Sequence, residues 1–215
     1  KLEESLRGSA GSRRIEVNAL GRVMRELDRQ EGIAGTDMQL TIDARLQAYV
    51  EARLEGESAA AVVMDCLTGD LVAVGNAPSF DPNLFVRGIS VDDWTGLNDS
   101  VYRPLAAKAV QGAYPPGSTF KMITALAALE SGALGPDETV YCGGVTEVSG
   151  TRFHCWRAAG HGNIDLHDSL EQSCDLYYYD IGQRAGIDRI AAMARRLGLG
   201  LRHDVPMSAI SAGLT

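Results

Sequence analysis

The sequence predicts an α/β chain of the α+β type, in which helices flank an antiparallel sheet and a smaller, extended fragment comes first. Apolar residues recur at helical spacing in residues 40–54, 118–131, 165–186 and 187–200, which is the pattern of amphipathic helices. Two apolar, β-prone runs within residues 58–76 flank "DCLTGD", and such runs around a glycine-containing turn indicate a β-hairpin. With 215 residues and a hydrophobic fraction of 45%, the chain can bury one substantial core.

The beginning of the chain differs in character from the rest. Residues 1–38 are polar and interrupted by glycine, with a short β-like piece at 13–27. We interpret them as a fragment of a separate, mostly extended pedestal module or linker. The helix predicted over residues 40–54 opens a second region, and Asp43 can accept hydrogen bonds at its first turn. The sequence therefore predicts a division into residues 1–38 and 39–215.

The later elements follow from local signals. The helix over residues 118–131 should end at Gly132, because glycine readily adopts the left-handed conformation that closes a helix. Residues 135–164 hold many glycines and are predicted to be mostly loop. Residues 165–186 and 187–200 are predicted as two consecutive helices.

Charge and hydropathy indicate what is not expected within these residues. The formal net charge is −8, without a long lysine- or arginine-rich block, so electrostatic binding to nucleic acid is not expected. No apolar run approaches the roughly 20 residues that cross a bilayer, and no secretory leader opens the chain. Because residue 1 is lysine rather than methionine, we interpret the sequence as part of a longer protein.

The stretch "YPPGSTFK" places a hydroxyl and an amine at the start of the helix predicted over residues 118–131. Ser118 and Lys121 are three residues apart, so they should be neighbours on the helix surface. A serine hydroxyl needs a nearby base to act as a nucleophile, and partial burial favours the neutral form of a lysine. The pair therefore suits an acyl-accepting serine, although S-x-x-K also arises by chance and Ser118 could be a simple helix cap.

A second element lies in "EQSCDLYYYD", where Ser173 and Asp175 form an S-x-D motif on a predicted helix. S-x-x-K followed by S-x-[ND] is shared by penicillin-binding proteins and serine β-lactamases. In addition, "TIDARLQ", "AAAVVMDCLTGDLVAV", "PSFDPN", "YPPGSTFK" and "SCDLYYYDIG" occur in this order. This series resembles the transpeptidase domain of class B penicillin-binding proteins, in particular the branch that serves cell elongation. "EVNALGR" resembles that family's junction between the pedestal and transpeptidase regions.

The resemblance implies a serine-type D,D-transpeptidase that cross-links peptidoglycan stem peptides through an acyl-enzyme. Ser118 would attack the penultimate D-alanine carbonyl, and Lys121 would be the general base. Ser173 would relay protons, while Asp175, at a position where many relatives have asparagine, would contact the lysine or the substrate. The family's K-[ST]-G element is absent from these residues, so the transpeptidase domain is expected to be incomplete at its C-terminal side and this chain alone to be inactive.

The same resemblance implies partners and a location. Peptidoglycan stem peptides and β-lactams would be the ligands, and a SEDS-type glycan polymerase and scaffold proteins of the elongation complex would be the partners. The protein would work at the periplasmic face of the bacterial inner membrane, with its membrane anchor outside this chain.

Four cysteine and histidine residues have a spacing that could hold a metal ion. Cys142, Cys155, His161 and Cys174 follow the pattern C-x12-C-x5-H-x12-C, and three thiolates with one imidazole make a tetrahedral structural zinc set. The resemblance supports zinc, because some members of this branch bind metal at corresponding loop positions. A disulfide between Cys142 and Cys155, or His154 in place of His161, are the competing interpretations. Cys66 is predicted to be an inert core cysteine.

The sequence is also compatible with two other functions. A serine β-lactamase would share the nucleophile but would need a deacylating water and rapid release of the acyl group. Alternatively, the chain could be a non-catalytic, zinc-stabilised interaction module. The rate at which a penicilloyl group leaves Ser118, and whether it forms at all, would separate the three.

Overall fold

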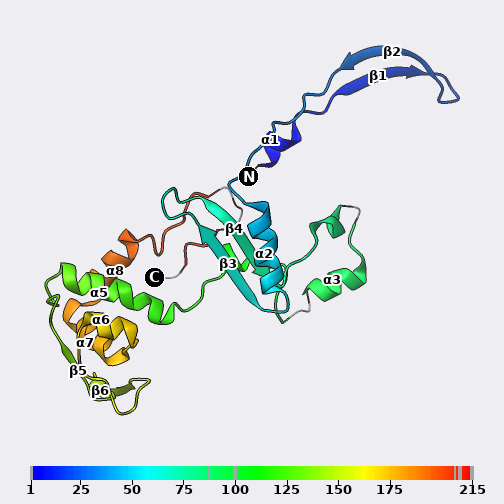
Figure 1. Ribbon diagram of the computed structural model, residues 1–215. Coiled ribbons are helices and arrows are strands. Elements are labelled where there is room, and N and C mark those ends of the chain that lie inside the picture. The colour runs from blue at the N-terminus through cyan, green and yellow to red at the C-terminus, as the bar shows by residue number, and fades with distance from the viewer. Residues whose placement is uncertain (1, 87, 99–100, 206, 208–209, 214–215) are drawn as a thin grey trace. The chain divides into compact units, whose positions relative to one another are not determined.

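A computed structural model of the chain describes residues 2–86, 88–98, 101–205, 207 and 210–213. The chain divides into two compact units, one of residues 1–112 with 204–210 and one of residues 113–203 with 211–215 (Figure 1). Within the described residues, strands pair only antiparallel, in four two-stranded sheets. The predicted combination of helices and antiparallel strands is confirmed. Among the described helices, none has the length and apolar character needed to cross a membrane.

The first unit contains two hairpins and short helices. Its elements are α1 (Glu3–Arg7), β1 (Ser12–Val17), β2 (Val23–Gln30), α2 (Ala44–Leu54), β3 (Ala59–Met64), β4 (Leu71–Ala77), the 3₁₀ turn η1 (Pro82–Phe85), α3 (Val91–Asn98) and α4 (Lys108–Gln111). The β1–β2 ribbon is exposed along its whole length, in keeping with the extended fragment predicted for this part of the chain. The division predicted between residues 38 and 39 stays a prediction.

Helix α2 and the β3–β4 hairpin have the predicted local structure, and α2 packs on the hairpin (Figure 1). Asp43 accepts hydrogen bonds from the backbone N–H groups of Arg45 and Leu46 at 2.8 and 2.9 Å, as its capping role requires. The Gln47 side chain ties the helix to β4, because it donates to the Val74 carbonyl at 3.0 Å and accepts from the Val74 N–H at 2.8 Å.

The prediction that Cys66 is a core residue is wrong. Cys66 is an exposed free thiol in the turn that joins β3 to β4. Asp65 accepts hydrogen bonds from the N–H groups of Leu67 and Thr68, and Gly69 has a positive φ of 80°. These contacts form a tight surface turn, in which a side chain at position 66 points to solvent.

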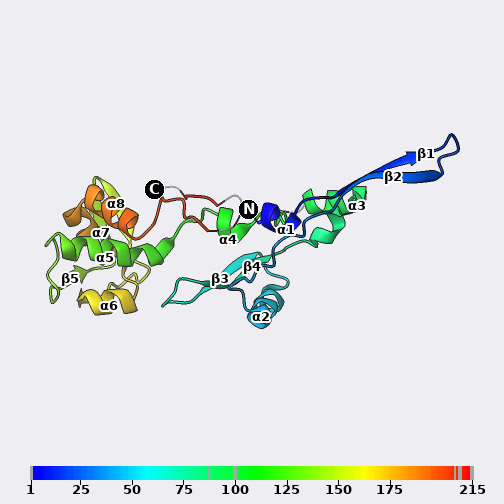
Figure 2. The same cartoon turned by 90° about the horizontal axis from the view of Figure 1, so that it is seen from above.

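The second unit holds every residue predicted to take part in chemistry or metal binding. Its elements are the 3₁₀ turn η2 (Gly117–Phe120), α5 (Lys121–Glu130), β5 (Val140–Cys142), β6 (Val145–Val148), β7 (Thr151–His154), β8 (Gly162–Ile164), α6 (Leu166–Glu171), α7 (Asp175–Ala185) and α8 (Ile187–Arg196). Helices α5, α7 and α8 pack against one another (Figure 2).

The core of this unit lies between α5 and α7. Ala125 and Ala128 of α5 are buried, and Tyr177 and Ile181 of α7 are 0% exposed. Small side chains on one helix let the bulky side chains of the other approach closely, as dense packing requires. This contact fixes the beginning of α5 relative to the beginning of α7, where the candidate catalytic residues lie.

The prediction that residues 135–164 are mostly loop misses four short strands, although more than half of these residues lie outside them. This segment forms two small antiparallel pairs, β5 with β8 and β6 with β7. The strands have three or four residues each, too few to display an alternating pattern. The glycines that indicated a loop lie at the bends between strands, where Gly144, Gly150 and Gly160 have positive φ at little steric cost.

Candidate active site and candidate metal centre

Ser118 lies at the surface, in the 3₁₀ turn that leads into α5. Pro115 and Pro116 precede it, and Gly117 has a positive φ of 55°. The Thr119 hydroxyl donates to the Pro116 carbonyl at 2.5 Å, which closes the turn. Lys121 is the first residue of α5. The sequence thus places an exposed hydroxyl in the turn and a lysine at the first position of the helix that follows.

Ser173 lies in a break between two helices, whereas the sequence predicted one continuous helix over residues 165–186. Helix α6 ends at Glu171 and α7 begins at Asp175. Ser173 has a φ of 50°, a left-handed conformation that costs a residue with a side chain roughly 1–2 kcal/mol. The Cys174 N–H donates back to the Ser169 carbonyl at 3.0 Å. This turn points the Ser173 hydroxyl toward the start of α5.

The structure joins all four predicted catalytic residues in one hydrogen-bond chain. The Ser173 hydroxyl donates to the Ser118 hydroxyl at 2.9 Å. Lys121 Nζ donates to the Ser173 hydroxyl at 3.0 Å and to the Ser173 carbonyl at 2.8 Å. It also donates to Asp175 Oδ1 at 2.8 Å. The two residues predicted to be direct neighbours, Ser118 and Lys121, are therefore linked through Ser173.

The lysine and the aspartate form a partly buried ion pair. The side chains of Lys121 and Asp175 are 13% and 29% exposed, so their attraction is screened less than that of a surface pair. The Tyr178 ring lies 5.6 Å from Lys121 Nζ, within the range of a cation–π contact. Burial raises the pKa of Tyr178, whose hydroxyl lies 3.1 Å from the Ser169 hydroxyl. The Lys121 ammonium group therefore lies between a carboxylate and an aromatic ring.

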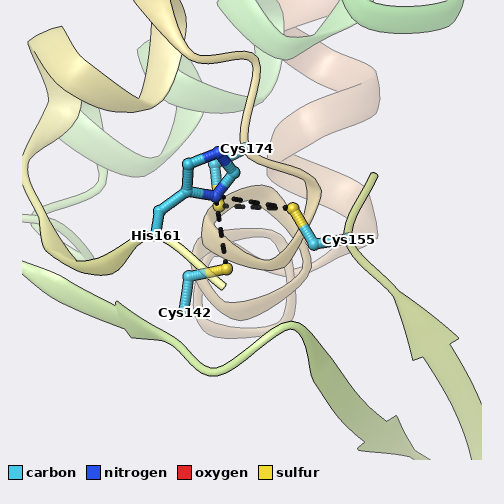
Figure 3. Close-up of side chains that lie close together, drawn as sticks. All are labelled: Cys142, Cys155, His161 and Cys174. Atoms are coloured by element: carbon cyan, nitrogen blue, oxygen red, sulfur yellow. Dashed lines mark hydrogen bonds between the residues drawn. The ribbon is translucent and has the colours of Figure 1, made fainter. Parts of the chain in front are cut away.

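The four predicted metal ligands lie close together, and one of them, Cys174, stands between Ser173 and Asp175 in the sequence. Figure 3 shows the side chains of Cys142, Cys155, His161 and Cys174 pointing toward one another. His161 Nδ1 lies 3.5 Å from Cys142 Sγ and 3.6 Å from Cys155 Sγ, and the sulfurs of Cys155 and Cys174 are 4.0 Å apart. All four ligand atoms lie within 4.8 Å of one another. The three cysteines are buried free thiols, so the structure does not contain the alternative disulfide.

These distances suit tetrahedral coordination. Ligand bonds of zinc to sulfur and nitrogen imply edges of about 3.8 Å between two sulfurs and about 3.6 Å between sulfur and nitrogen. Burial raises the pKa of the Cys155 thiol, but N–H groups of Arg157, Asp175 and Leu176 outweigh it and leave that pKa lowered. Burial raises the pKa of Cys174 to about 12, and a bound cation would counteract that effect by stabilising the thiolate.

Other predicted assignments can be compared with their surroundings. His154 belongs to β7 and is exposed, outside the cluster of ligands. The three consecutive tyrosines differ in burial, because Tyr177 is 0% and Tyr179 36% exposed. Sequence reasoning assigned no role to Trp156. This residue is 63% exposed, and its indole and its backbone N–H each donate one hydrogen bond to the segment that carries Ser173. A tryptophan next to a predicted ligand was the only signal available.

Comparison with known proteins identifies the family to which a chain with this site belongs. Residues 59–215 match the model of the penicillin binding protein transpeptidase domain, and residues 1–40 match that of the penicillin-binding protein dimerisation domain. The chain belongs to the penicillin-binding protein transpeptidase family. The predicted resemblance and fold class are confirmed.

Among its relatives, the chain is similar to penicillin-binding protein 2. The peptidoglycan D,D-transpeptidase MrdA of Escherichia coli K12 is 40% identical over 200 residues, which cover 92% of this chain and 32% of MrdA. The structure of Pseudomonas aeruginosa PBP2 in complex with WCK 5153 is 38% identical with a TM-score of 0.81, over 86% of this chain and 42% of that one. PBP2 of Helicobacter pylori in complex with MreC is 32% identical with a TM-score of 0.82, over 93% of this chain and 37% of that one. The chain spans about a third of the length of the curated relatives it matches.

Proposed function

We propose that the protein containing this chain is a peptidoglycan D,D-transpeptidase in which Ser118 is the nucleophile. The observation that carries the proposal is the hydrogen-bond chain from Ser118 through Ser173 to Lys121 and Asp175. It connects an exposed hydroxyl to a partly buried amine, as activation of a serine requires. Relatives named D,D-transpeptidases support the substrate class.

In the acylation step, the Ser118 oxygen forms a bond to the penultimate D-alanine carbonyl carbon. Its proton passes to the Ser173 oxygen, while the Ser173 proton passes to a neutral Lys121. Collapse of the tetrahedral intermediate breaks the carbon–nitrogen bond, and a proton passes from Lys121 through the Ser173 hydroxyl to the departing D-alanine amine, without involving the acylated Ser118 oxygen. An amine of a second stem peptide then attacks the ester and regenerates Ser118. A β-lactam would acylate the same oxygen by opening its ring.

The contacts of Lys121 in the structure suit the charged resting form. Nζ donates three hydrogen bonds, and an ammonium group has three protons. One of these bonds is the ion pair with Asp175. Lys121 must therefore lose a proton before acylation, and Asp175 would hold its nitrogen in reach of Ser173 throughout.

We further propose that Cys142, Cys155, His161 and Cys174 hold a structural zinc ion. Their mutual distances and the lowered pKa of Cys155 support this assignment. Zinc has no redox chemistry, and a site with four protein ligands leaves no position for substrate. The role of these residues would be to tie the β5–β8 segment to Cys174, which lies between Ser173 and Asp175.

The partners and location are also proposals. The H. pylori relative was solved in complex with MreC, and we propose that a scaffold protein of that kind and a SEDS-type glycan polymerase bind the full-length protein. Its place of work would be the periplasmic face of the bacterial inner membrane.

A fluorescent penicillin tests the catalytic assignment in the full-length protein. The wild-type protein should be labelled covalently, and Ser118→Ala should abolish the label. Ser131→Ala, at the other end of the same helix, should retain it and serves as the matched control. Rapid loss of label would instead favour a β-lactamase, and absence of label in the wild type would favour a non-catalytic module.

Elemental analysis with thiol titration tests the metal site. We expect one zinc per protein and a gain of reactive thiols when a chelator is added. Cys142→Ser should lose the metal, whereas Cys66→Ser should keep it, because Cys66 is exposed and lies in the other unit. Full metal content in Cys142→Ser would contradict the four-ligand site.

A further inference from the structure

Trp156 makes two hydrogen bonds to the segment between α6 and α7. Its indole Nε1–H donates to the Gln172 carbonyl at 2.8 Å, and its backbone N–H donates to Asp175 Oδ2 at 3.2 Å. These two acceptors lie on either side of Ser173. Trp156 thus contacts the turn that carries the Ser173 hydroxyl on both sides, with its side chain at Gln172 and with its backbone at Asp175.

The indole bond gives a hydrogen-bond donor to a carbonyl at the end of α6. Gln172 is the C-cap residue of α6, and the last carbonyls of a helix accept no hydrogen bond from within that helix. The left-handed conformation of Ser173 stops α6 at this point. By donating to the Gln172 carbonyl, the indole stabilises the helix end and thereby the turn that follows.

The second bond uses an oxygen that only a carboxylate offers. Asp175 Oδ1 accepts from Lys121 Nζ, and Oδ2 accepts from the Trp156 N–H. Two acceptor oxygens on one planar group fix the rotation of the side chain. An asparagine has one acceptor oxygen and one NH₂ group, so in the same orientation its NH₂ group would face one of these donors.

Trp156 also borders the cysteine and histidine cluster without belonging to it. It follows Cys155 directly, and its ring lies 5.4 Å from the His161 ring in an edge-to-face arrangement. The cluster contacts the turn through Cys174, which is one of its members. Trp156 contacts the same turn through hydrogen bonds to Gln172 and Asp175.

We propose that Trp156 is a positioning residue for acylation, which keeps Ser173 and Asp175 aligned with Ser118 and Lys121. This inference rests on the proposed function. A hydrogen bond between uncharged groups contributes about 1 kcal/mol, and a misaligned relay slows proton transfer rather than ligand binding. Loss of the indole bond should therefore reduce the acylation rate constant about fivefold.

The test compares Trp156→Phe with Trp94→Phe in the full-length protein. Phenylalanine keeps an aromatic ring and the backbone N–H but lacks the indole donor. Trp94 belongs to α3 in the other unit, so it is a matched control. Stopped-flow kinetics with a penicillin separate the dissociation constant of the initial complex from the acylation rate constant.

We expect Trp156→Phe to acylate about fivefold more slowly, with an unchanged dissociation constant and metal content and a melting temperature lowered by at most about 4 °C. Trp94→Phe should match the wild type. An acylation rate within twofold of the wild type would overturn the inference, and so would a loss of metal or a lower melting temperature that accounts for the slower rate. If Trp156→Phe does not fold, replacement by benzothienylalanine, which keeps the size of tryptophan without the N–H group, gives the same comparison. A wild-type protein that is not acylated would instead refute the proposed function itself.

Discussion

The left-handed serine at position 173 allows its hydroxyl and its backbone to be tested separately. Ser173→Ala removes the hydroxyl that links Ser118 and Lys121 and keeps a side chain at a φ of 50°. Ser173→Gly removes the same hydroxyl and also relieves the steric cost of that conformation. After allowance for the greater freedom of glycine in the unfolded chain, the glycine variant should hold the α6–α7 turn about 1 kcal/mol more firmly than the alanine variant.

Both variants should acylate at least about a hundredfold more slowly than the wild type, the lower range for loss of a proton-transfer group. Hydrogen exchange of amides at the α6–α7 junction should be about fivefold slower in the glycine variant than in the alanine variant. Ser149→Gly is the control, because Ser149 also has a positive φ, of 51°, and lies in the exposed β6–β7 turn. It should slow exchange in its own hairpin and leave acylation unchanged. Recovery of acylation in Ser173→Gly would refute the role of the hydroxyl.

Three further changes test local structure in the two units. Asp43→Ala removes the N-cap of α2. It should lower the free energy that protects the amides of α2 from hydrogen exchange by about 1 kcal/mol. Gly144→Ala would place a methyl group 2.1 Å from a backbone oxygen and should therefore prevent metal binding. Gly150→Ala is the control, because a methyl group there meets open space and should only weaken the β6–β7 turn. Equal metal content in the two variants would contradict this expectation. Tyr178→Phe removes the contact with Ser169 and should cost about 1 kcal/mol of stability, while acylation stays within twofold because the ring beside the lysine remains.

The parts of the fold that could be predicted from sequence are those with a local physical signal. Asp43 next to a helical pattern predicted the cap of α2, and the glycine-containing turn predicted the β3–β4 hairpin. The pair of Ser118 and Lys121 was visible because the two residues are three apart in the sequence, although the structure links their side chains through Ser173 rather than directly. The cap and the hairpin are made by residues that are close in sequence.

The parts that failed depend on contacts between distant segments. A left-handed Ser173 has no sequence signal, since the conformation is held by bonds from Trp156 and Lys121, which are far away in the chain. The strands β5 to β8 are too short to show alternation, and only their pairing defines them. The gathering of Ser118 and Asp175 around Lys121 likewise comes from the packing of α5 against α7, although the family resemblance had indicated it.

Intact-protein mass spectrometry of the full-length protein after treatment with penicillin G tests whether Ser118 is acylated. We expect a mass increase equal to one penicillin, retained over many minutes and mapped by peptide analysis to the tryptic segment that contains Ser118. An adduct on another residue, or an unmodified protein that has consumed the penicillin, would contradict it.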